Sequence, residues 1–261
     1  MLTYYTWSMS MNDSTIRRLA KLTSSFYKKT ASDFSESRSF AWTGWNNLQA
    51  HLEHRSHEPL QILDLGCGNG RFSKFLKEKF PKLHFEYTGI DGNAHLLKDA
   101  KKTLKKLDVP FSLHKVDLVD CLLTDTQLLE EGGRRFDLVT IFGVIHHIPS
   151  FELRKQLFAG LGELLHRNGK VVITFWDFIP AERLAKKQVD PNIIGIDPQK
   201  LEKDDYIIDW KRGVAAFRYV HHTTKKEMNQ LVAASGLELV DSYRADGKEG
   251  NLNYYVVLEK K

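Results

Sequence analysis

Three glycines at alternate positions, directly after a short apolar segment, constrain this chain more than any other feature. Residues 62–70 read Ile-Leu-Asp-Leu-Gly-Cys-Gly-Asn-Gly, and the run Arg-Phe-Ser-Lys-Phe-Leu follows them. This order predicts a buried strand, a tight turn and the start of a helix, because glycine adopts backbone conformations that other residues avoid. A turn without side chains lets a ligand approach the backbone closely, and the helix start behind it offers free N–H groups. The dinucleotide-binding fingerprint would need its third glycine at position 71, where this chain has arginine.

Three later apolar segments also end in residues suited to ligand binding. The segments 85–91 and 111–117 end in Asp91 and Asp117, and the segment 136–142 ends in phenylalanine. Ligands bind outside the carboxyl ends of strands in open α/β sheets, and an acid after the second strand accepts hydrogen bonds from ribose hydroxyls. Asp91 is therefore predicted to bind a ribose, and Asp117 to meet an adenine amino group. Each feature alone is also found in plain surface turns, but together they predict a bound nucleotide.

Apolar strands and amphipathic helices alternate through the middle of the chain. This alternation predicts an α/β fold, with a doubly wound, mostly parallel sheet that carries helices on both faces. Two helices are expected before it, at 14–29 and ending near His54, and a capping box from Thr224 to Glu227 begins a late helix that ends at Gly236. The expected units are a disordered tail (1–12), an N-terminal helical extension (13–57), a ligand-binding core (58–176), an inserted, proline-containing cap without a regular pattern (177–222), and a C-terminal helix and strand pair (223–261).

Composition excludes several classes of protein. The 261 residues are 42% hydrophobic, enough for one sizeable core, but no apolar run reaches the length of a membrane span, so no membrane partner is expected. The start of the chain lacks a signal-peptide pattern and two cysteines cannot form a disulfide framework, which together indicate the cytoplasm. The net charge of +5 is compatible with a nucleic-acid substrate without demonstrating one. Lysines at 98–106 lie on the outer face of a predicted helix, and such faces are more often merely solvated. No metal site is predicted.

The glycine turn is similar to a known motif. With Asp64 two residues before Gly66, it resembles motif I of the class I S-adenosylmethionine-dependent methyltransferases. The resemblance implies a Rossmann-like sheet of seven strands with an antiparallel last strand, S-adenosyl-L-methionine as cofactor and S-adenosyl-L-homocysteine as product. The residues that it assigns to the cofactor are Tyr27, as a cover, and Asp64, Gly66, Cys67, Gly68, Gly70, Asp91, Gly92, Asp117, Leu118 and Phe142.

A second, more specific set of motifs occurs in order along residues 24–258. The motifs are Ser-Glu-Ser-Arg-Ser-Phe-Ala-Trp (35–42), Gly-Val-Ile-His-His (143–147), Phe-Trp (175–176), Ile-Asp-Trp (208–210), Arg-Tyr-Val-His (218–221) and Asn-Leu-Asn-Tyr-Tyr (251–255). Together they resemble the tRNA methyltransferases that esterify the 5-carboxymethyl group of the wobble uridine. The chain departs from that family's usual pattern where Asp177 lacks a following glutamine and where Asp209 replaces a proline before Trp210. The resemblance implies a tRNA substrate and a small zinc-binding activator protein as a partner.

The same resemblance indicates residues for the methyl acceptor. A carboxylate is ionised at neutral pH, so its methylation needs positioning and no general base. Arginine binds carboxylates through paired N–H groups, and we expect one anchor from Arg38 and Arg218. At least one of His146 and His147 is expected to contact substrate, although such a pair also serves to pack a fold or cap a helix. The other candidates are Trp42, Trp176 and Trp210, which would stack on a flipped-out base unless they pack in the core, and His221, which ends its motif.

Two other functions fit these motifs. A small-molecule carboxyl- or O-methyltransferase would share the cofactor site, and a hydroxyl acceptor would need a base, for which His147 is the candidate. A cofactor-binding but inactive partner subunit is the second. The intact glycines and acids argue against loss of cofactor binding, but not against loss of catalysis.

Overall fold

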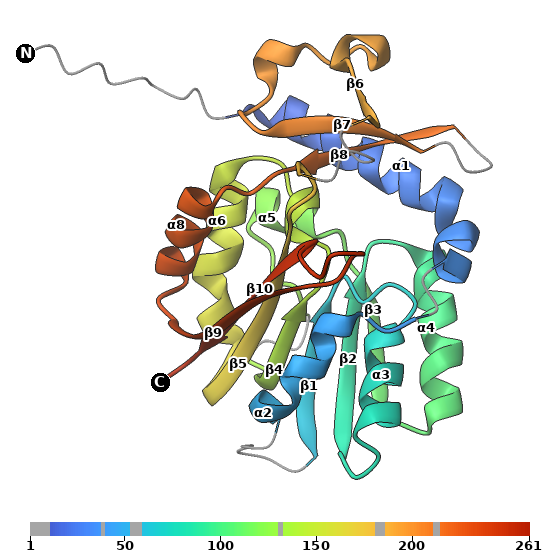
Figure 1. Ribbon diagram of the computed structural model, residues 1–261, viewed down its shortest axis with the longest axis vertical. Coiled ribbons are helices and arrows are strands. Elements are labelled where there is room, and N and C mark those ends of the chain that lie inside the picture. The colour runs from blue at the N-terminus through green and yellow to red at the C-terminus, as the bar shows by residue number, and fades with distance from the viewer. Residues whose placement is uncertain (1–10, 38–39, 53–58, 130–132, 181–185, 211–214) are drawn as a thin grey trace, which may run out of the picture.

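A seven-stranded sheet lies at the centre of the molecule (Figure 1). The computed structural model describes residues 11–37, 40–52, 59–129, 133–180, 186–210 and 215–261. In spatial order the strands are β3 (Phe111–Lys115), β2 (Phe85–Asp91), β1 (Leu60–Leu65), β4 (Phe136–Ile141), β5 (Leu165–Trp176), β10 (Asn253–Glu259) and β9 (Glu238–Ala245). Strand β10 runs antiparallel to both neighbours, and the other pairings are parallel. The prediction of a mostly parallel, doubly wound, seven-stranded sheet is confirmed.

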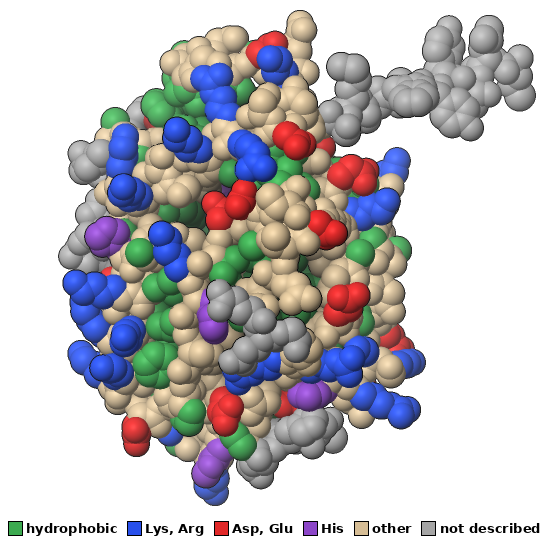
Figure 2. Space-filling view, turned by 180° about the vertical axis from the view of Figure 1, so that it is seen from behind, with side chains coloured by type: hydrophobic (Ala, Val, Ile, Leu, Met, Phe, Trp, Pro, Cys, Tyr) green, Lys and Arg blue, Asp and Glu red, His purple; other side chains and the backbone are tan. Residues whose placement is uncertain are grey.

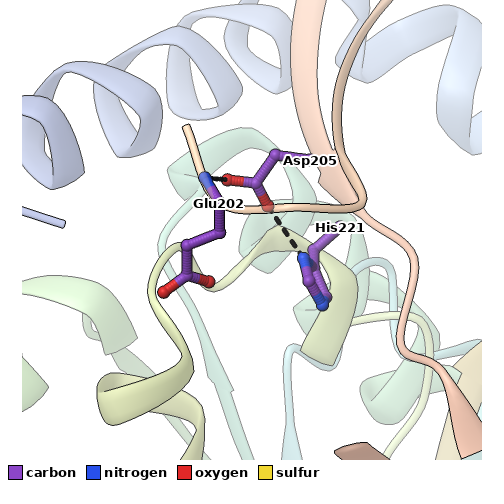
Figure 3. A group of neighbouring side chains, drawn as sticks. All are labelled: Glu202, Asp205 and His221. Atoms are coloured by element: carbon purple, nitrogen blue, oxygen red, sulfur yellow. Dashed lines mark hydrogen bonds and ion pairs between the residues drawn. The ribbon is translucent and has the colours of Figure 1, made fainter. Parts of the chain in front are cut away.

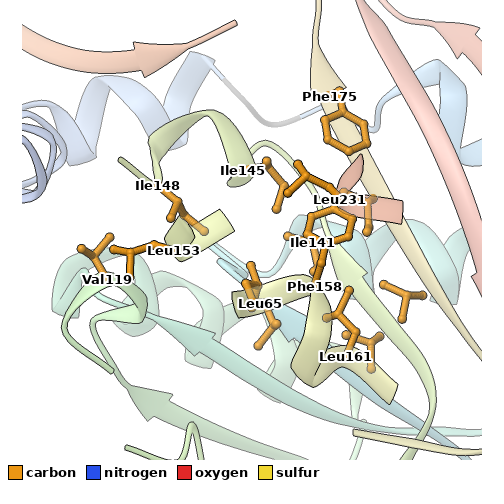
Figure 4. Packing of buried hydrophobic residues seen from close by; sticks show 14 of the residues in the cluster. Leu65, Val119, Ile141, Ile145, Ile148, Leu153, Phe158, Leu161, Phe175 and Leu231 are labelled. Atoms are coloured by element: carbon orange, nitrogen blue, oxygen red, sulfur yellow. The ribbon is translucent and has the colours of Figure 1, made fainter. Parts of the chain in front are cut away.

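Helices cover both faces of this sheet over two hydrophobic cores. Side chains alternate along β1, so that Leu63 and Leu65 enter one core while Leu60 and Ile62 enter the other. The first core, shown in Figure 4, lies under α5 (Leu118–Thr124), α6 (Phe151–Gly160) and α8 (Lys225–Ser235). The second lies under η1 (Thr43–Leu48), α2 (Gln49–Leu52), α3 (Arg71–Lys79) and α4 (Ala94–Leu107). Burial on both faces explains why the central strands are almost continuously apolar.

A second, antiparallel sheet stands over the carboxyl ends of the central strands (Figure 1). It contains β6 (Gln188–Val189), β7 (Asp205–Trp210) and β8 (Ala216–His221), and the long helix α1 (Asp13–Ser37) packs against β8. Two short 3-10 helices, η4 (Pro191–Ile194) and η5 (Pro198–Lys200), connect β6 to β7. The sequence indicated no regular structure here. The sequence did not predict strand β7, because its adjacent residues Ile207 and Ile208 are both buried. The strand therefore lacks the usual alternation of apolar and polar residues.

Several boundaries differ from the sequence-based expectation. Most of the expected tail lies outside the described residues, but Met11 is buried and the Asn12 side chain caps α1 by accepting a hydrogen bond from the Thr15 backbone N–H at 2.9 Å. Helix α1 continues eight residues beyond position 29, to Ser37. The expected second helix is a 3-10 turn followed by one α-helical turn, and residues 53–58 lie outside the description. Among the described helices, none has both the length and the apolar character of a membrane span.

Candidate active site

A cavity of about 590 Å³ lies between the central sheet and the second sheet. Its volume falls within the usual range for small-ligand sites. Most predicted site residues line it: Tyr27, Trp42, Asp64, Gly66, Cys67, Gly68, Asp91, Gly92, Asp117, Leu118, Phe142, His146, His147, Trp176 and Arg218. Trp210 lines it as well, whereas Gly70 and His221 do not, and Arg38 lies outside the described residues.

The glycine turn forms the floor at the end of β1. The backbone N–H groups of Gly66 and Cys67 donate to the Ile90 carbonyl at 2.8 and 2.9 Å, which ties the turn to β2. A Cβ at Gly66 would come within 2.3 Å of Val144, so packing excludes a side chain there. A Cβ at Gly68, where φ is +55°, would meet no protein atom within 4 Å. The space above Gly68 is therefore open, and a side chain at this position would fill it. A bound cofactor needs this space to approach the backbone.

Gly70 serves packing and does not line the cavity. A Cβ there would come within 3.2 Å of the Ala100 backbone in α4, and φ is +75°. The absence of a side chain at Gly70 lets α3 begin close against α4, and a cofactor contact at Gly70 stays a prediction.

Asp91 and Asp117 line the cavity, and protein groups already occupy part of their hydrogen-bonding capacity. Asp91 accepts the Gly68 N–H at 2.9 Å and the Asn93 N–H at 2.7 Å, one at each oxygen. Burial raises the pKa of Asp91, and these two bonds oppose that rise. Asp117 caps α5 through Oδ1, which accepts two backbone N–H groups at 3.0 and 3.2 Å. A carboxylate offers about four acceptor positions, so both acids fit additional donors such as ribose hydroxyls or an adenine amino group.

Asp64 lies beneath the turn and joins three strands. Its oxygens accept the Tyr87 hydroxyl at 2.5 Å and the Thr140 hydroxyl at 2.8 Å. Burial raises the pKa of Asp64 to about 6, against the opposing effect of these hydrogen bonds. Although Asp64 borders the cavity, its carboxylate is engaged by β2 and β4, so its evident role is to support the floor.

A chain of hydrogen bonds crosses the wall opposite the glycine turn. His147 Nδ1 lies 2.9 Å from the Tyr219 carbonyl oxygen, which can only accept, so Nδ1 carries a proton. In the neutral ring Nε2 then accepts the Tyr27 hydroxyl, 2.8 Å away. The Tyr27 oxygen in turn accepts an N–H of Arg218 at 3.3 Å. The side chains of α1, the loop after β4 and strand β8 thereby form one polar unit.

Arg218 presents a buried positive charge to the cavity. The residue is 7% exposed, and its guanidinium carbon lies 5.0 Å from the centre of the Phe26 ring and 5.3 Å from that of Trp176. Within the described part of the chain, the Arg218 side chain donates one hydrogen bond, to Tyr27, and forms no ion pair with a carboxylate. Burying a charge is costly unless an opposite charge accompanies it, so this wall favours an anionic ligand.

The remaining aromatic candidates pack against neighbours while bordering the cavity. The ring of His146, which is buried, lies 4.9 Å from Trp176 and 4.1 Å from His147. Trp42 stacks on Trp45 with ring centres 5.5 Å apart. These contacts fit packing, and stacking of Trp42 or Trp176 on a base stays a prediction.

His221 points away from the cavity into a buried ionic cluster, part of which Figure 3 shows. Its ring nitrogens lie 2.8 Å from Asp205 and 2.7 Å from Glu227, and Arg154 of α6 pairs with Glu202 at 2.9 Å and with Glu227 at 2.8 Å. Burial opposes the charged ring, but the two carboxylates outweigh it and raise the pKa of His221. The prediction that His221 is catalytic is therefore corrected: it holds the second sheet on α6 and α8.

Sequence reasoning missed three residues of the site. Gly143, with φ +72°, lies so near Trp42 that a Cβ would come within 3.3 Å of that ring, and its position directly after a buried strand was an available signal. Asn93 borders the cavity and caps α4, and its place just after the second strand was a further signal. Nothing in the sequence singled out Phe26, which lies against Arg218 only through the packing of α1 on β8.

Comparison with known proteins finds relatives with this architecture. Residues 63–171 match the model of a methyltransferase domain. The chain is an S-adenosylmethionine-dependent methyltransferase. An S-adenosylmethionine-dependent methyltransferase of Clostridium acetobutylicum shares its fold, with a TM-score of 0.63, 14% identity, and coverage of 90% of this chain and 98% of that one.

Two curated relatives of this methyltransferase act on different acceptors. A tRNA (carboxymethyluridine(34)-5-O)-methyltransferase of Schizosaccharomyces pombe is 22% identical over 252 residues, which cover 90% of this chain and 94% of that protein. A ubiquinone biosynthesis O-methyltransferase of Mesorhizobium japonicum is 24% identical over 217 residues, which cover 79% of this chain and 75% of that protein.

Proposed function

We propose that this methyltransferase esterifies the carboxylate of 5-carboxymethyluridine at the wobble position of tRNA. The observation that carries the proposal is the guanidinium of Arg218, buried between two aromatic rings, facing the cavity and lacking a carboxylate partner among the described residues. An acceptor carboxylate would supply the missing negative charge. Arginine suits it because its planar N–H groups match a carboxylate better than a lysine does.

The protein's part in such a reaction is positioning. S-adenosylmethionine, when bound, supplies a methyl group on a positively charged sulfur, and Gly68 and Asp91 are the residues whose surroundings best fit it. Because the acceptor carboxylate is ionised at neutral pH, no side chain needs to remove a proton. Arg218 would orient the carboxylate, and Tyr27 would hold the guanidinium in place through its hydroxyl. Orientation of this kind contributes about 7–11 kcal/mol in the best cases.

The S. pombe relative supports a tRNA acceptor because the similarity covers nearly all of both chains. The motifs around the cavity, from Trp42 to Arg218, also resemble that enzyme family. On the same grounds we propose that a small zinc-binding activator protein accompanies this enzyme.

The test is direct methylation of tRNA that carries the free carboxymethyl group. Such tRNA is incubated with the enzyme, alone and with a candidate activator, and its nucleosides are analysed by mass spectrometry. We expect a gain of one methyl group on the wobble uridine, removable by mild alkali as an ester is. Methylation elsewhere on the tRNA, or no methylation with an activator present, would contradict the proposal.

A hydroxyl acceptor is the second candidate, and the Tyr27–His147 pair favours it. His147 Nε2 is already directed at a hydroxyl, 2.8 Å away, and such a nitrogen can remove a proton from an acceptor. The relative from M. japonicum is an O-methyltransferase of ubiquinone biosynthesis. The two candidates differ in pH dependence, because only a hydroxyl acceptor needs the neutral form of His147.

A further inference from the structure

Two helices that each contribute residues to the cavity lining carry exposed lysines. Helices α1 and α4 touch each other, and each also contributes to the cavity: Ser24 and Tyr27 from α1, and Leu96 from α4. We name as the basic strip their exposed residues Lys21, Lys28, Lys29, Lys98, Lys101, Lys105 and Lys106. In Figure 2, which views the molecule from behind, lysine and arginine side chains gather along the left, the side on which α4 lies.

Most of these lysines have no evident role in stabilising the fold; the exceptions are Lys105 and Lys106, which lie in the last turn of α4, where positive charge favours the helix end. None of the seven forms an ion pair with a described residue; the neighbouring Lys102 pairs with Asp99 at 3.0 Å, and Arg17 with Asp120 at 2.8 Å. Lys101 and Lys105 lie one turn apart on α4, where like charges slightly destabilise a helix. A strip of like charges without internal partners is suited to an external polyanion.

We propose that the basic strip binds the phosphate backbone of the RNA substrate and so brings a nucleotide to the cavity. This inference rests on the tRNA acceptor proposed above. RNA fits better than an anionic membrane, because a helix lying on a membrane needs an exposed apolar face. The apolar side of α4 is buried in the core at Leu97 and Leu104, and α1 presents Ser24 and Ser25 between its lysines.

An exposed aromatic residue at the cavity mouth supports the same partner independently. Phe40 is 82% exposed, far more than is usual for a large apolar side chain, and it borders the cavity beside the half-buried Trp42. Unpaired bases stack on such aromatic surfaces in RNA-binding proteins, and cations alongside hold the backbone. The strip and Phe40 therefore offer the two elements that a single-stranded loop needs.

The experiment measures binding of a fluorescently labelled anticodon stem-loop RNA to the full chain by anisotropy, without turnover. One variant carries Lys28→Glu and Lys29→Glu, and a second carries Lys98→Glu and Lys101→Glu. The matched control carries Lys225→Glu and Lys226→Glu, which are also exposed but lie on α8, a helix that covers the first core and contributes no residue to the cavity lining. We expect each strip variant to lose at least about tenfold in RNA affinity, while the control stays within about twofold of the parent.

The salt dependence gives a second readout that a folding defect would not produce. In matched Lys→Gln variants, the slope of log affinity against log salt should fall by about 1 for each phosphate contact removed. S-adenosylmethionine affinity should not change in any of these variants, which checks that they are folded.

Several outcomes would overturn the inference. The inference fails if the strip variants bind RNA as tightly as the parent does. It also fails if the protein binds phosphatidylserine vesicles through the strip and does not bind RNA. RNA binding by the strip with no ester formed would leave the inference standing and refute the proposed acceptor. Methylation of tRNA with an unchanged Michaelis constant in the strip variants would refute the inference and leave the proposed acceptor standing.

Discussion

The two halves of the cavity are built in different ways. The half around Gly68 and Asp91 is made from backbone and from acids at adjacent strand ends, all within the central sheet. The opposite half is made from the side chains of Tyr27, His147 and Arg218, which come from α1, the 3-10 helix η2 (Ile145–His147) and strand β8 of the second sheet. The first half depends on how one turn is shaped, and the second on how three distant segments pack.

This difference predicts that binding of S-adenosylmethionine and binding of the proposed acceptor can change separately. The turn is held by hydrogen bonds to Ile90 and Asp91 of β2, and no hydrogen bond among the described residues joins it to the second sheet. Changes in the half around Gly68 should therefore weaken cofactor binding, whereas changes around Arg218 should leave cofactor affinity intact. The predictions below test this separation.

The largest effect is expected from Gly68→Val. The new side chain has no protein atom within reach of its Cβ and would fill the cofactor's space, so binding of S-adenosylmethionine should become undetectable by calorimetry. Gly236→Val is the matched control, because Gly236 has φ +64°, equally open surroundings and a position at the end of α8. Both variants should lose similar stability to backbone strain, but only the first should lose the cofactor.

The next largest effect concerns Asp64 and pH. Because the pKa of Asp64 is raised to about 6 in the fold, the native state binds its proton more tightly than the unfolded chain does between about pH 4 and 6. This group therefore makes the free energy of unfolding fall as pH rises through that window, by about 3 kcal/mol. Urea denaturation at pH 4 to 7 should show that part of the fall disappearing in Asp64→Asn. An identical pH profile in the variant would show that Asp64 titrates normally.

Asp91→Ala should weaken S-adenosylmethionine by roughly 1.5–3 kcal/mol, the usual range for a lost hydrogen bond to a charged group. The substitution also removes the acceptor of the Gly68 N–H, which shapes the turn. Asp91→Asn keeps one acceptor oxygen and should lose less. Calorimetric affinities equal to those of the parent would place the cofactor elsewhere.

The smallest of these effects is expected from Arg218→Lys. Lysine keeps the charge but not the paired N–H groups, so the Michaelis constant for the acceptor should rise about tenfold, with a smaller fall in turnover. The affinity for S-adenosylmethionine should not change, because the two halves of the cavity are expected to act independently. Arg244→Lys is the control, since Arg244 is exposed and pairs with Asp177 at 2.7 Å. A loss of cofactor affinity in Arg218→Lys would show that the halves are coupled.

The sequence was informative where structure is local. The glycine turn, the capping of α8 by Thr224 and its stop at Gly236 could all be predicted, because each depends on residues within a few positions of one another. The order of strands and helices in the core could be predicted for the same reason.

The half around Arg218 was less predictable because it depends on which side of each segment faces inward. Arg218 and His221 lie three residues apart on β8, yet one faces the cavity and the other a buried cluster with Arg154. Residues three apart on a strand point to opposite faces, but the sequence did not reveal that a strand was there. Likewise, the contact of Phe26 with Arg218 exists only once α1 lies on β8.

The central claim is that the half around Arg218 binds an ionised carboxylate and needs no base. It is tested most directly by the single-turnover rate of methylation between pH 6 and 9, measured for the parent and for His147→Ala. The account predicts a flat profile for both, with the variant slower by about tenfold to a hundredfold because its acceptor is misplaced. A parent rate that rises through a pKa near 6.5, with the rise absent in the variant, would instead identify His147 as a general base and the acceptor as a hydroxyl.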